Sequence, residues 1–467
     1  MADQENLTKD ADLPEKEASN GVNMQYLILL AVAASLGGLL FGYDTAVIAG
    51  AIGFLAEKFE LTAAMKGWTA SSAIIGCIFG AMFAGVISDR FGRKRVLIVT
   101  AILFAISAIG SAIPQSLVEL IGARFIGGLG VGAASMLAPL YISEISPAHV
   151  RGRLVTLYQL AIVVGIQVIY FVNLLISGSG DETWNIDLGW RYMFGSEIIP
   201  AILFLILLLK VPESPRWLAK QGRDDDALDT LTRINGSKRA NEILDEIKES
   251  FKDDTGTLAE LFKPGLRTAM VIGIMLALFS QITGINAIIY YAPEIFKGAG
   301  FATESAMMQT VIIGLVNLIF TFVALWLIDK LGRKKLLLFG ISGMFLCLLG
   351  LGTVFYLDMA SGPFVLIFIL GYVASFASAM GPIPWVMISE IFPTRKRGLA
   401  ISIAVLVLWF AVYLVTQLFP IMTEQFGEAT TFWIFMINCI VIFLFVLFKV
   451  PETKGKTLEE IEQSWKK

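Results

Sequence analysis

The stretch Ser88-Asp-Arg-Phe-Gly-Arg-Lys-Arg95 recurs about half a chain later as Ile328-Asp-Lys-Leu-Gly-Arg-Lys-Lys335. Each copy lies between two long apolar runs, so the flanking segments repeat together with the motif. Repetition of this kind indicates a chain built from two duplicated halves. Duplicated membrane proteins typically move solutes by rocking one half against the other.

Two further motifs recur in the same order. They are Glu144-Ile-Ser-Pro147 followed by Arg151-Gly152, repeated as Glu390-Ile-Phe-Pro393 followed by Arg397-Gly398, and Pro212-Glu-Ser-Pro-Arg216, repeated loosely as Pro451-Glu-Thr-Lys-Gly455. Three signatures in one order make an internally duplicated membrane protein the simplest interpretation.

The composition is that of a membrane protein, with 56% hydrophobic and 16% charged residues. Apolar runs of about 20 residues, long enough to cross a bilayer as helices, lie near 25–49, 67–88, 95–113, 118–142, 153–177, 190–210, 269–297, 305–328, 335–357, 362–388, 398–420 and 429–450. The runs do not alternate in polarity as the strands of a membrane barrel do. We therefore predict an all-α membrane protein with twelve transmembrane helices in two pseudo-symmetric six-helix halves.

The segments between the apolar runs define the domains. We expect a disordered cytoplasmic tail at 1–23, which lacks the features of a signal peptide, halves at 24–210 and 265–450, a cytoplasmic linker at 211–264 and a cytoplasmic tail at 451–467. Apolar residues at helical spacing predict short amphipathic helices at Asp224–Arg233, Asn241–Phe251 and Thr457–Trp465. The alternative for the linker is a solvated segment without order.

Lysine and arginine fix the expected orientation. They concentrate in 89–95, 143–153, 210–267, 330–335 and 395–397 and are sparse in the alternate loops. Positive loops stay inside, so both termini should be cytoplasmic in a multi-pass protein of the plasma or inner membrane.

Several other classes of function are disfavoured. The net charge of −3 comes with no basic face for nucleic acid. The three cysteines lie inside apolar spans, which predicts buried thiols. The sequence has no phosphate-binding Gly-Lys-Ser/Thr loop, which an ATP-driven pump would need. We expect no enzyme activity, no metal and no cofactor, and a monomer in the lipid bilayer.

The first, fourth, seventh and tenth spans carry glycine and proline. Their clusters are Gly37-Gly38 with Gly42, Gly127-Gly128 with Gly130, Gly132 and Pro139, Gly284 with Pro293, and Gly381-Pro-Ile-Pro384. Interrupted helices at corresponding places in both halves indicate a central cavity, where irregular backbone is tolerated. Close helix packing through small residues is the alternative, and it suffices for Gly127 to Gly132.

Three charges lie inside apolar spans. Asp44 is in the first span, Arg124 in the fourth and Glu197 in the sixth. An ionised carboxylate at that depth costs about 3 kcal/mol or more unless it is paired or faces water. A carboxylate that exchanges an arginine partner for a proton would couple solute movement to protons, and Glu197 could share Arg124. The alternative is a permanent structural ion pair.

Amides and tryptophans from several spans are candidates for a binding site. The amides are Gln159, Gln281, Asn286 and Asn317, and the tryptophans are Trp385 and Trp409. An amide offers a donor beside an acceptor, which matches neighbouring hydroxyls of a sugar, while an indole can cover the apolar face of the ring. Gln281 and Asn286 share a helix face only if Gly284 distorts the helix. Interhelical hydrogen bonds and interface anchoring are the alternatives.

The repeated polar motifs suggest a cytoplasmic gate made of Asp89, Arg93, Glu144, Arg151, Asp329, Arg333, Glu390 and Arg397. Asp89 and Asp329 lie at helix ends, where a helix N-terminus or an arginine can hold them. We expect Glu144 to pair with Arg151, and Glu390 with Arg397, across the inner face when the cytoplasmic side is closed. Acidic residues contribute little to membrane orientation, so motifs that only set topology would not need them.

Together these residues resemble the sugar porter family of the major facilitator superfamily, from about Tyr26 to Trp465. The matching motifs are Gly-Gly-Leu-Leu-Phe-Gly-Tyr-Asp (37–44), Asp-Arg-Phe-Gly-Arg-Lys (89–94), Pro-Glu-Ser-Pro-Arg-Trp-Leu (212–218), Gly-Ile-Asn (284–286) and Pro-Glu-Thr-Lys-Gly (451–455). The stretch Gly189-Trp-Arg-Tyr-Met-Phe194 looks closest to bacterial D-xylose:proton symporters.

The resemblance implies proton coupling at Asp44 with Arg124. It also implies a monosaccharide site at Phe41, Gln159, Gln281, Asn286, Tyr290, Asn317, Gly381, Trp385 and Trp409. Two amides expected from the family are replaced, by Ser280 and by Leu408. The substrate could therefore be xylose, glucose, galactose, arabinose or an inositol.

We thus expect a proton-coupled monosaccharide symporter, for a pentose or hexose, that imports sugar by alternating access. The alternatives are a uniporter of the same fold, an inositol or polyol symporter and, least favoured, a sugar sensor that does not transport.

Overall fold

The computed structural model describes residues 22–251, 266–392 and 397–454. The described residues are helical, with turns and short loops between the helices and no strand among them. The N-terminal tail at 1–21 and the expected helix Thr457–Trp465 lie outside the described residues.

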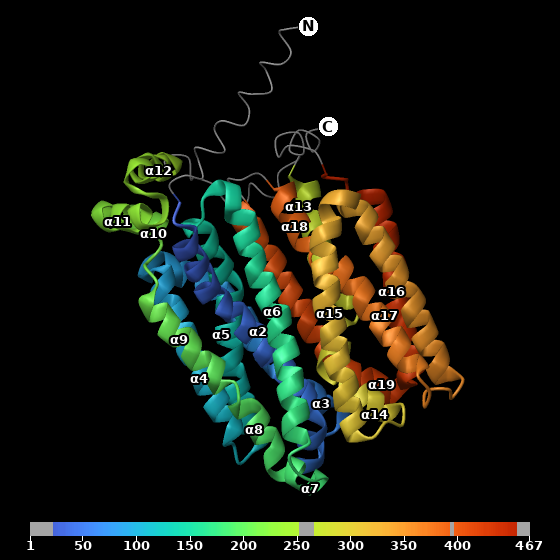
Figure 1. Ribbon diagram of the computed structural model, residues 1–467. Coiled ribbons are helices and arrows are strands. Elements are labelled where there is room, and N and C mark those ends of the chain that lie inside the picture. Colours follow the sequence, from blue (N-terminus) through green and yellow to red (C-terminus); the bar gives the residue numbers. More distant parts are fainter. Residues whose placement is uncertain (1–21, 252–265, 393–396, 455–467) are drawn as a thin grey trace.

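The first half is built from long helices joined by short loops (Figure 1). They are α2 (Met24–Lys58), α3 (Ala63–Phe91), α4 (Arg93–Ala112), α5 (Leu117–Ile145) and α6 (Ala148–Ser177). A sixth span runs through α7 (Glu182–Trp184), the π-turn η1 (Asn185–Gly189), α8 (Trp190–Gly195) and α9 (Ile198–Lys210).

The second half repeats this plan. Its spans are α13 (Arg267–Ile282) with α14 (Ile285–Gly298), α15 (Thr303–Leu331), α16 (Arg333–Tyr356), α17 (Phe364–Ser378) with α18 (Ile383–Ile391), and α19 (Arg397–Lys449). Eleven segments of the described chain are long and apolar enough to cross a membrane. The last holds two spans because α19 bends at Gly427, whose φ is 77°. The prediction of twelve helical spans in two halves is confirmed.

Between the halves, α10 (Pro215–Lys220), α11 (Asp224–Asn235) and α12 (Ser237–Ser250) form a small helical cap. Trp217, Leu231 and Leu244 form its apolar core, and the backbone N–H of Asn23 ties it to α2 by donating to the Ile234 carbonyl at 2.8 Å. The cap lies at one end of the bundle, near the start of α2 (Figure 1). We call this the linker end, and the opposite end the far end.

The repeated motifs have the same structural role in both halves. Glu213, which follows the sixth span, accepts hydrogen bonds from the backbone N–H groups of Arg93 (2.9 Å) and Lys94 (3.0 Å). Glu452, which follows the last span, accepts from the N–H groups of Arg333 (3.0 Å) and Lys334 (3.1 Å). Each acid therefore caps the N-terminus of a helix, α4 or α16, where a negative charge is favoured.

The helix interruptions occur in only two of the four expected spans. The backbone breaks at Gly284, which has a φ of +92° and separates α13 from α14, and between α17 and α18. In the first and fourth spans α2 and α5 run without a break, so the alternative of close helix packing, which suffices for Gly127 to Gly132, applies there. There the glycines allow close packing: a Cβ at Gly42 would collide with the Ile162 carbonyl on α6, and one at Gly128 with the Ala73 carbonyl on α3.

Candidate functional site

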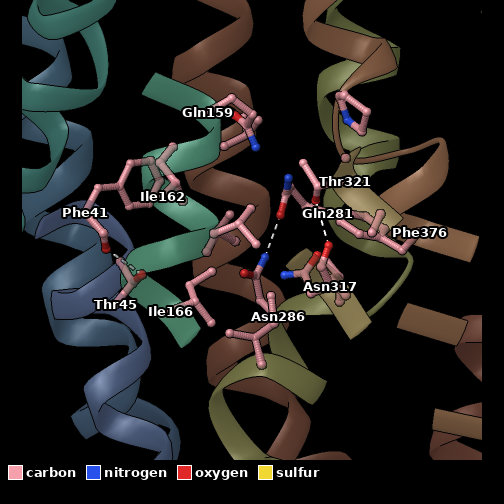
Figure 2. Close-up of a pocket in the computed structure, with 18 of the residues that line it drawn as sticks. Phe41, Thr45, Gln159, Ile162, Ile166, Gln281, Asn286, Asn317, Thr321 and Phe376 are labelled. Atoms are coloured by element: carbon pink, nitrogen blue, oxygen red, sulfur yellow. Dashed lines mark hydrogen bonds between the residues drawn. The ribbon is translucent and has the colours of Figure 1, made fainter. Parts of the chain in front are cut away.

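A cavity of about 150 Å³ lies between the two halves. Figure 2 shows side chains of α2 and α6 on one side of it and side chains of α13, α14 and α15 on the other. The structure places around this cavity all nine residues that the family resemblance implied: Phe41, Gln159, Gln281, Asn286, Tyr290, Asn317, Gly381, Trp385 and Trp409.

The amides of the seventh span form a connected group. The Gln281 side-chain NH2 donates to the Ser280 hydroxyl (3.0 Å), and the Asn286 NH2 donates to the Gln281 carbonyl oxygen (2.5 Å). These two amides meet because the chain turns at Gly284, whose positive φ an L-residue rarely adopts. The break thus directs both side chains into the cavity.

Aromatic rings close part of the cavity. Phe41 on α2 and Trp409 on α19 are in contact across the two halves, with ring centroids 5.3 Å apart. Trp409 is buried, whereas Trp385 on α18 is 38% exposed. The cavity therefore combines amide hydrogen-bonding groups with apolar ring faces, which is the mixture that binds a small polar ligand with a carbon skeleton.

Leu408, which replaces an amide expected from the family, also lines the cavity. Sequence reasoning missed the rest of the lining, which is Thr45, Ile162, Val163, Ile166, Ile285, Ile289, Thr321, Phe376, Ala377, Pro382 and Val412. Helical spacing could have found Thr321, because it follows Asn317 by one turn on α15. Most of the others are ordinary apolar residues of membrane helices, and no signal in one sequence separates them from residues that face lipid.

Asp44, Arg124 and Glu197 lie together within the membrane spans and do not line the cavity. Arg124 donates to the Asp44 carboxylate (2.5 Å) and to the Asp44 backbone carbonyl (2.9 Å). Asp44 is 0% exposed and Arg124 is 1% exposed, with the guanidinium 5.3 Å from the Phe194 ring centroid. Glu197 is also buried and interacts electrostatically with both partners. Asp44 is absent from the cavity lining, which Phe41 and Thr45 of the same helix reach (Figure 2).

At the linker end, a polar cluster ties the first half together. Arg93 donates to Asp89 (2.8 Å) and to both carboxylate oxygens of Glu144 (3.1 Å each). Ser214 donates to Glu144 at 2.6 Å, while Arg151 donates to the Ser146 carbonyl at 3.3 Å. Arg93 and Ser214 therefore hold the Glu144 carboxylate in this structure, and its expected pairing with Arg151 in the state closed to the cytoplasm stays a prediction.

The second half carries the matching cluster. Arg333 donates to Glu390 at 2.9 Å, and the Thr453 hydroxyl donates to the same carboxylate at 2.6 Å. The side chains of Asp329 and Arg397 lie outside the described part of the structure, so the expected Glu390–Arg397 pair stays a prediction. Both clusters, as far as they are described, join elements of one half and do not bridge the two halves.

At the far end, polar contacts bridge the two halves. Lys66 on α3 lies 3.4 Å from Glu294 on α14. Gln417 on α19 accepts from the Ser71 hydroxyl (2.9 Å) and donates to a backbone carbonyl of α3. The Tyr170 hydroxyl donates to the Ile289 carbonyl at 2.6 Å. The halves are thus held together at the far end.

Comparisons with known proteins agree with this architecture. A family model described as "Sugar (and other) transporter" matches residues 30–465. The chain belongs to the sugar transporter family. An arabinose-proton symporter of Bacillus subtilis (strain 168) is 50% identical over 453 residues, covering 97% of this transporter and 98% of that protein. A D-xylose-proton symporter of Escherichia coli (strain K12) is 44% identical over 475 residues, covering 95% and 96%.

Solved structures extend the similarity to the fold. The inward open conformation of the xylose transporter XylE from E. coli matches the transporter with a TM-score of 0.84 and 42% identity, covering 94% of this chain and 100% of that one. The major facilitator proton:xylose symporter XylE bound to 6-bromo-6-deoxy-D-glucose matches with a TM-score of 0.81 and 44% identity, covering 95% and 100%. The transporter therefore has the major facilitator fold.

Proposed function

We propose that this protein is a proton-coupled monosaccharide symporter that imports sugar by alternating access. The observation that carries the proposal is the cavity between the halves, lined by four amides and two tryptophans. Helix α2, which supplies part of this lining, also carries the buried carboxylate of Asp44, and Arg124 on α5 pairs with it. The relatives named as arabinose-proton and D-xylose-proton symporters support this function, and they favour a pentose as substrate.

The orientation follows from the basic loops. Lys and Arg concentrate at the linker end, which makes that end cytoplasmic and the far end extracellular. In that orientation the contacts that join the halves at the far end would close the transporter to the outside, as in an inward-facing state. The bacterial relatives support localisation in the inner membrane.

The sugar would bind through pairs of hydrogen bonds. Neighbouring hydroxyls both donate and accept, and the amides of Gln159, Gln281 and Asn317 supply both kinds of partner. Trp409 would cover the apolar face of the ring. Because the lining comes from both halves, a bound sugar draws them together, which lets one site serve each side of the membrane in turn.

Asp44 would carry the proton. In the deprotonated state Arg124 holds its carboxylate by an ion pair, which compensates part of the cost of burying the charge. Protonation removes the negative charge and releases Arg124 to other partners, including Glu197. One proton moving down a potential of about 100 mV supplies about 2.3 kcal/mol, enough for roughly fifty-fold accumulation of sugar.

Uptake into proteoliposomes tests this function. We expect labelled L-arabinose or D-xylose to accumulate above its external concentration when an inward proton gradient is imposed, and an uncoupler to abolish accumulation. A panel of competing hexoses and inositols would then rank the substrates. Uptake that only equilibrates and ignores the uncoupler would replace the proposal with a uniporter.

A further inference from the structure

The buried position of Asp44 raises the question of how a proton reaches it. Its side chain is 0% exposed and is absent from the cavity lining. The groups that face it include Arg124 on α5, Glu197, Cys77 on α3 and Tyr290 on α14. Of these groups Tyr290 also lines the sugar cavity, so a proton route kept separate from the sugar must reach Asp44 from another side.

Helix α4 supplies polar groups beside this site. Ser107 and Ser111 are one helical turn apart, and each is 1% exposed. Neither hydroxyl has a hydrogen-bond partner among the described residues. Thr100 on the same helix behaves differently, because its hydroxyl donates to the Val96 carbonyl one turn earlier at 2.9 Å. Buried polar groups without a protein partner commonly bind water.

Gly127 on α5 lets Ser107 and Asp44 approach each other. A Cβ at Gly127 would collide with the Ser107 hydroxyl and would lie 3.2 Å from the Asp44 carboxylate. The hydroxyl and the carboxylate therefore both lie against the same face of Gly127. The second Asp44 carboxylate oxygen, one Glu197 oxygen and the Arg124 Nε atom are also buried and have no partner among the described residues.

Ser111 extends this polar row toward the far end. It lies four residues beyond Ser107, about 6 Å along the helix axis, and directly before Ala112, the last residue of α4. The row thus runs from the ion pair to the end of the bundle that we assign to the extracellular side.

We propose that Ser107 and Ser111, with Gly127 allowing Ser107 close to the carboxylate, form a proton route, separate from the sugar cavity, between the extracellular end of α4 and Asp44. The inference rests on the proposed symport function. A hydroxyl both donates and accepts, so each serine takes one proton from a neighbouring water and passes one on. The proton ends on the Asp44 carboxylate, which becomes a carboxylic acid, and the serines and water are unchanged.

The outer end of the route is shut in this structure. Ser111 is buried, and Arg191 on α8 donates to the carbonyl of the adjacent Ala112 at 3.1 Å. Closure is what coupling requires of an inward-facing state, since a carboxyl open to the outside at that moment would return its proton. Movement of α8 away from the end of α4 would open the route in the outward-facing state.

The test uses the double variant Ser107→Ala/Ser111→Ala in proteoliposomes. Sugar-induced proton uptake should slow by about a hundredfold, the lower end of the range for losing a positioned proton-transfer group. The affinity for sugar and the rate of sugar exchange at equal pH should stay unchanged, because neither needs net delivery of a proton. The matched control is Thr100→Val, which removes a buried hydroxyl from the same helix whose partner is its own backbone, and it should leave proton uptake unchanged.

Two further variants keep the proposal falsifiable. Ser107→Thr keeps the hydroxyl and should retain most of the wild-type rate of proton uptake. Ser111→Ala alone should also slow proton uptake, although Ser111 lies one helical turn further from Asp44 than Ser107 does. The proton route is overturned, and the symport function is not, if the double variant takes up protons at the wild-type rate. The same holds if Thr100→Val takes up protons as slowly as the double variant. A wild type without sugar-induced proton uptake overturns the symport function together with it.

Discussion

Asp44 and Arg124 form a fully buried ion pair within the spans of the first half. Removing one partner of such a pair typically costs about 3–5 kcal/mol, because the other charge is left buried alone. A carboxylate that changes its protonation state avoids part of this cost if its partner can turn to another acid. Glu197, which is buried beside the pair, fits that role.

The first prediction concerns Asp44→Asn. Asparagine imitates the protonated acid and keeps an oxygen for Arg124, so the variant should still exchange sugar across the membrane but should not accumulate it. Counterflow and gradient-driven uptake in the same proteoliposomes would measure the two activities. The control is Asp229→Asn on α11, where the acid forms an exposed pair with Arg233. Accumulation by Asp44→Asn at the wild-type level would contradict the assignment.

The second prediction concerns the cavity amides. Gln159→Ala and Asn286→Ala should each weaken sugar binding by about tenfold, since each removes one or two hydrogen bonds of about 1 kcal/mol to the ligand. Titration calorimetry on purified protein would measure the affinity. Asn173→Ala is a matched control on α6, because that buried amide donates to the Val47 carbonyl and does not line the cavity. Unchanged affinity in the two cavity variants would make their amides structural.

At the scale of the site, polar residues could be predicted and apolar ones could not. Gln159 and Asn317 stand out because an amide in an apolar span needs a partner. Ile162 and Ile289 line the same cavity, but they have the chemistry of the lipid-facing positions. The pairing of Glu144 was also beyond the sequence, because Arg93 and Arg151 are equally plausible partners until the helices are placed.

At the scale of the elements, apolar length predicted every span, whereas glycine patterns could not distinguish a helix break from close packing. Gly284 and Gly42 are both glycines within apolar runs. Only the first has a positive φ, and the second lies against the backbone of α6. The difference arises from the neighbouring helix, so it is not visible in local sequence.

The third prediction concerns the helix cap of α16. Burial raises the pKa of Glu452, but the N–H groups of Lys454, Arg333, Lys334 and Thr453 outweigh it and hold the pKa below its ordinary 4.5. The ionised cap therefore stabilises the fold above that value, and its contribution is lost as the pH falls through the lowered pKa.

Thermal unfolding of wild type and Glu452→Gln would measure this effect. The difference in melting temperature between them should be largest near neutral pH and should shrink as the pH is lowered past 4.5. Glu246→Gln, an exposed substitution on α12, should leave the pH dependence of stability as it is in the wild type. A Glu452→Gln difference that stays constant over the whole range would mean that the charge of the cap is unimportant.

At the scale of the whole molecule, the contacts at the far end hold the two halves together, and in the proposed orientation they favour the inward-facing state. The fourth prediction is that Glu294→Gln shifts the population toward the outward-open state by about fivefold, because a partly exposed ion pair contributes about 1 kcal/mol. Distances between spin labels at Glu57 and Ala302, which are exposed at the far end in different halves, would report the shift. Asp187→Asn breaks a pair with Lys58 inside the first half and should not change the distances.

The two caps also bear on how the chain is made. Glu213, which caps α4, and Ser214, which holds Glu144, follow directly after the sixth span. The ribosome has therefore delivered the residues that close the first half before it translates the seventh span. The N-terminal half can therefore fold during synthesis, and the second half can then pack against a half that is already folded.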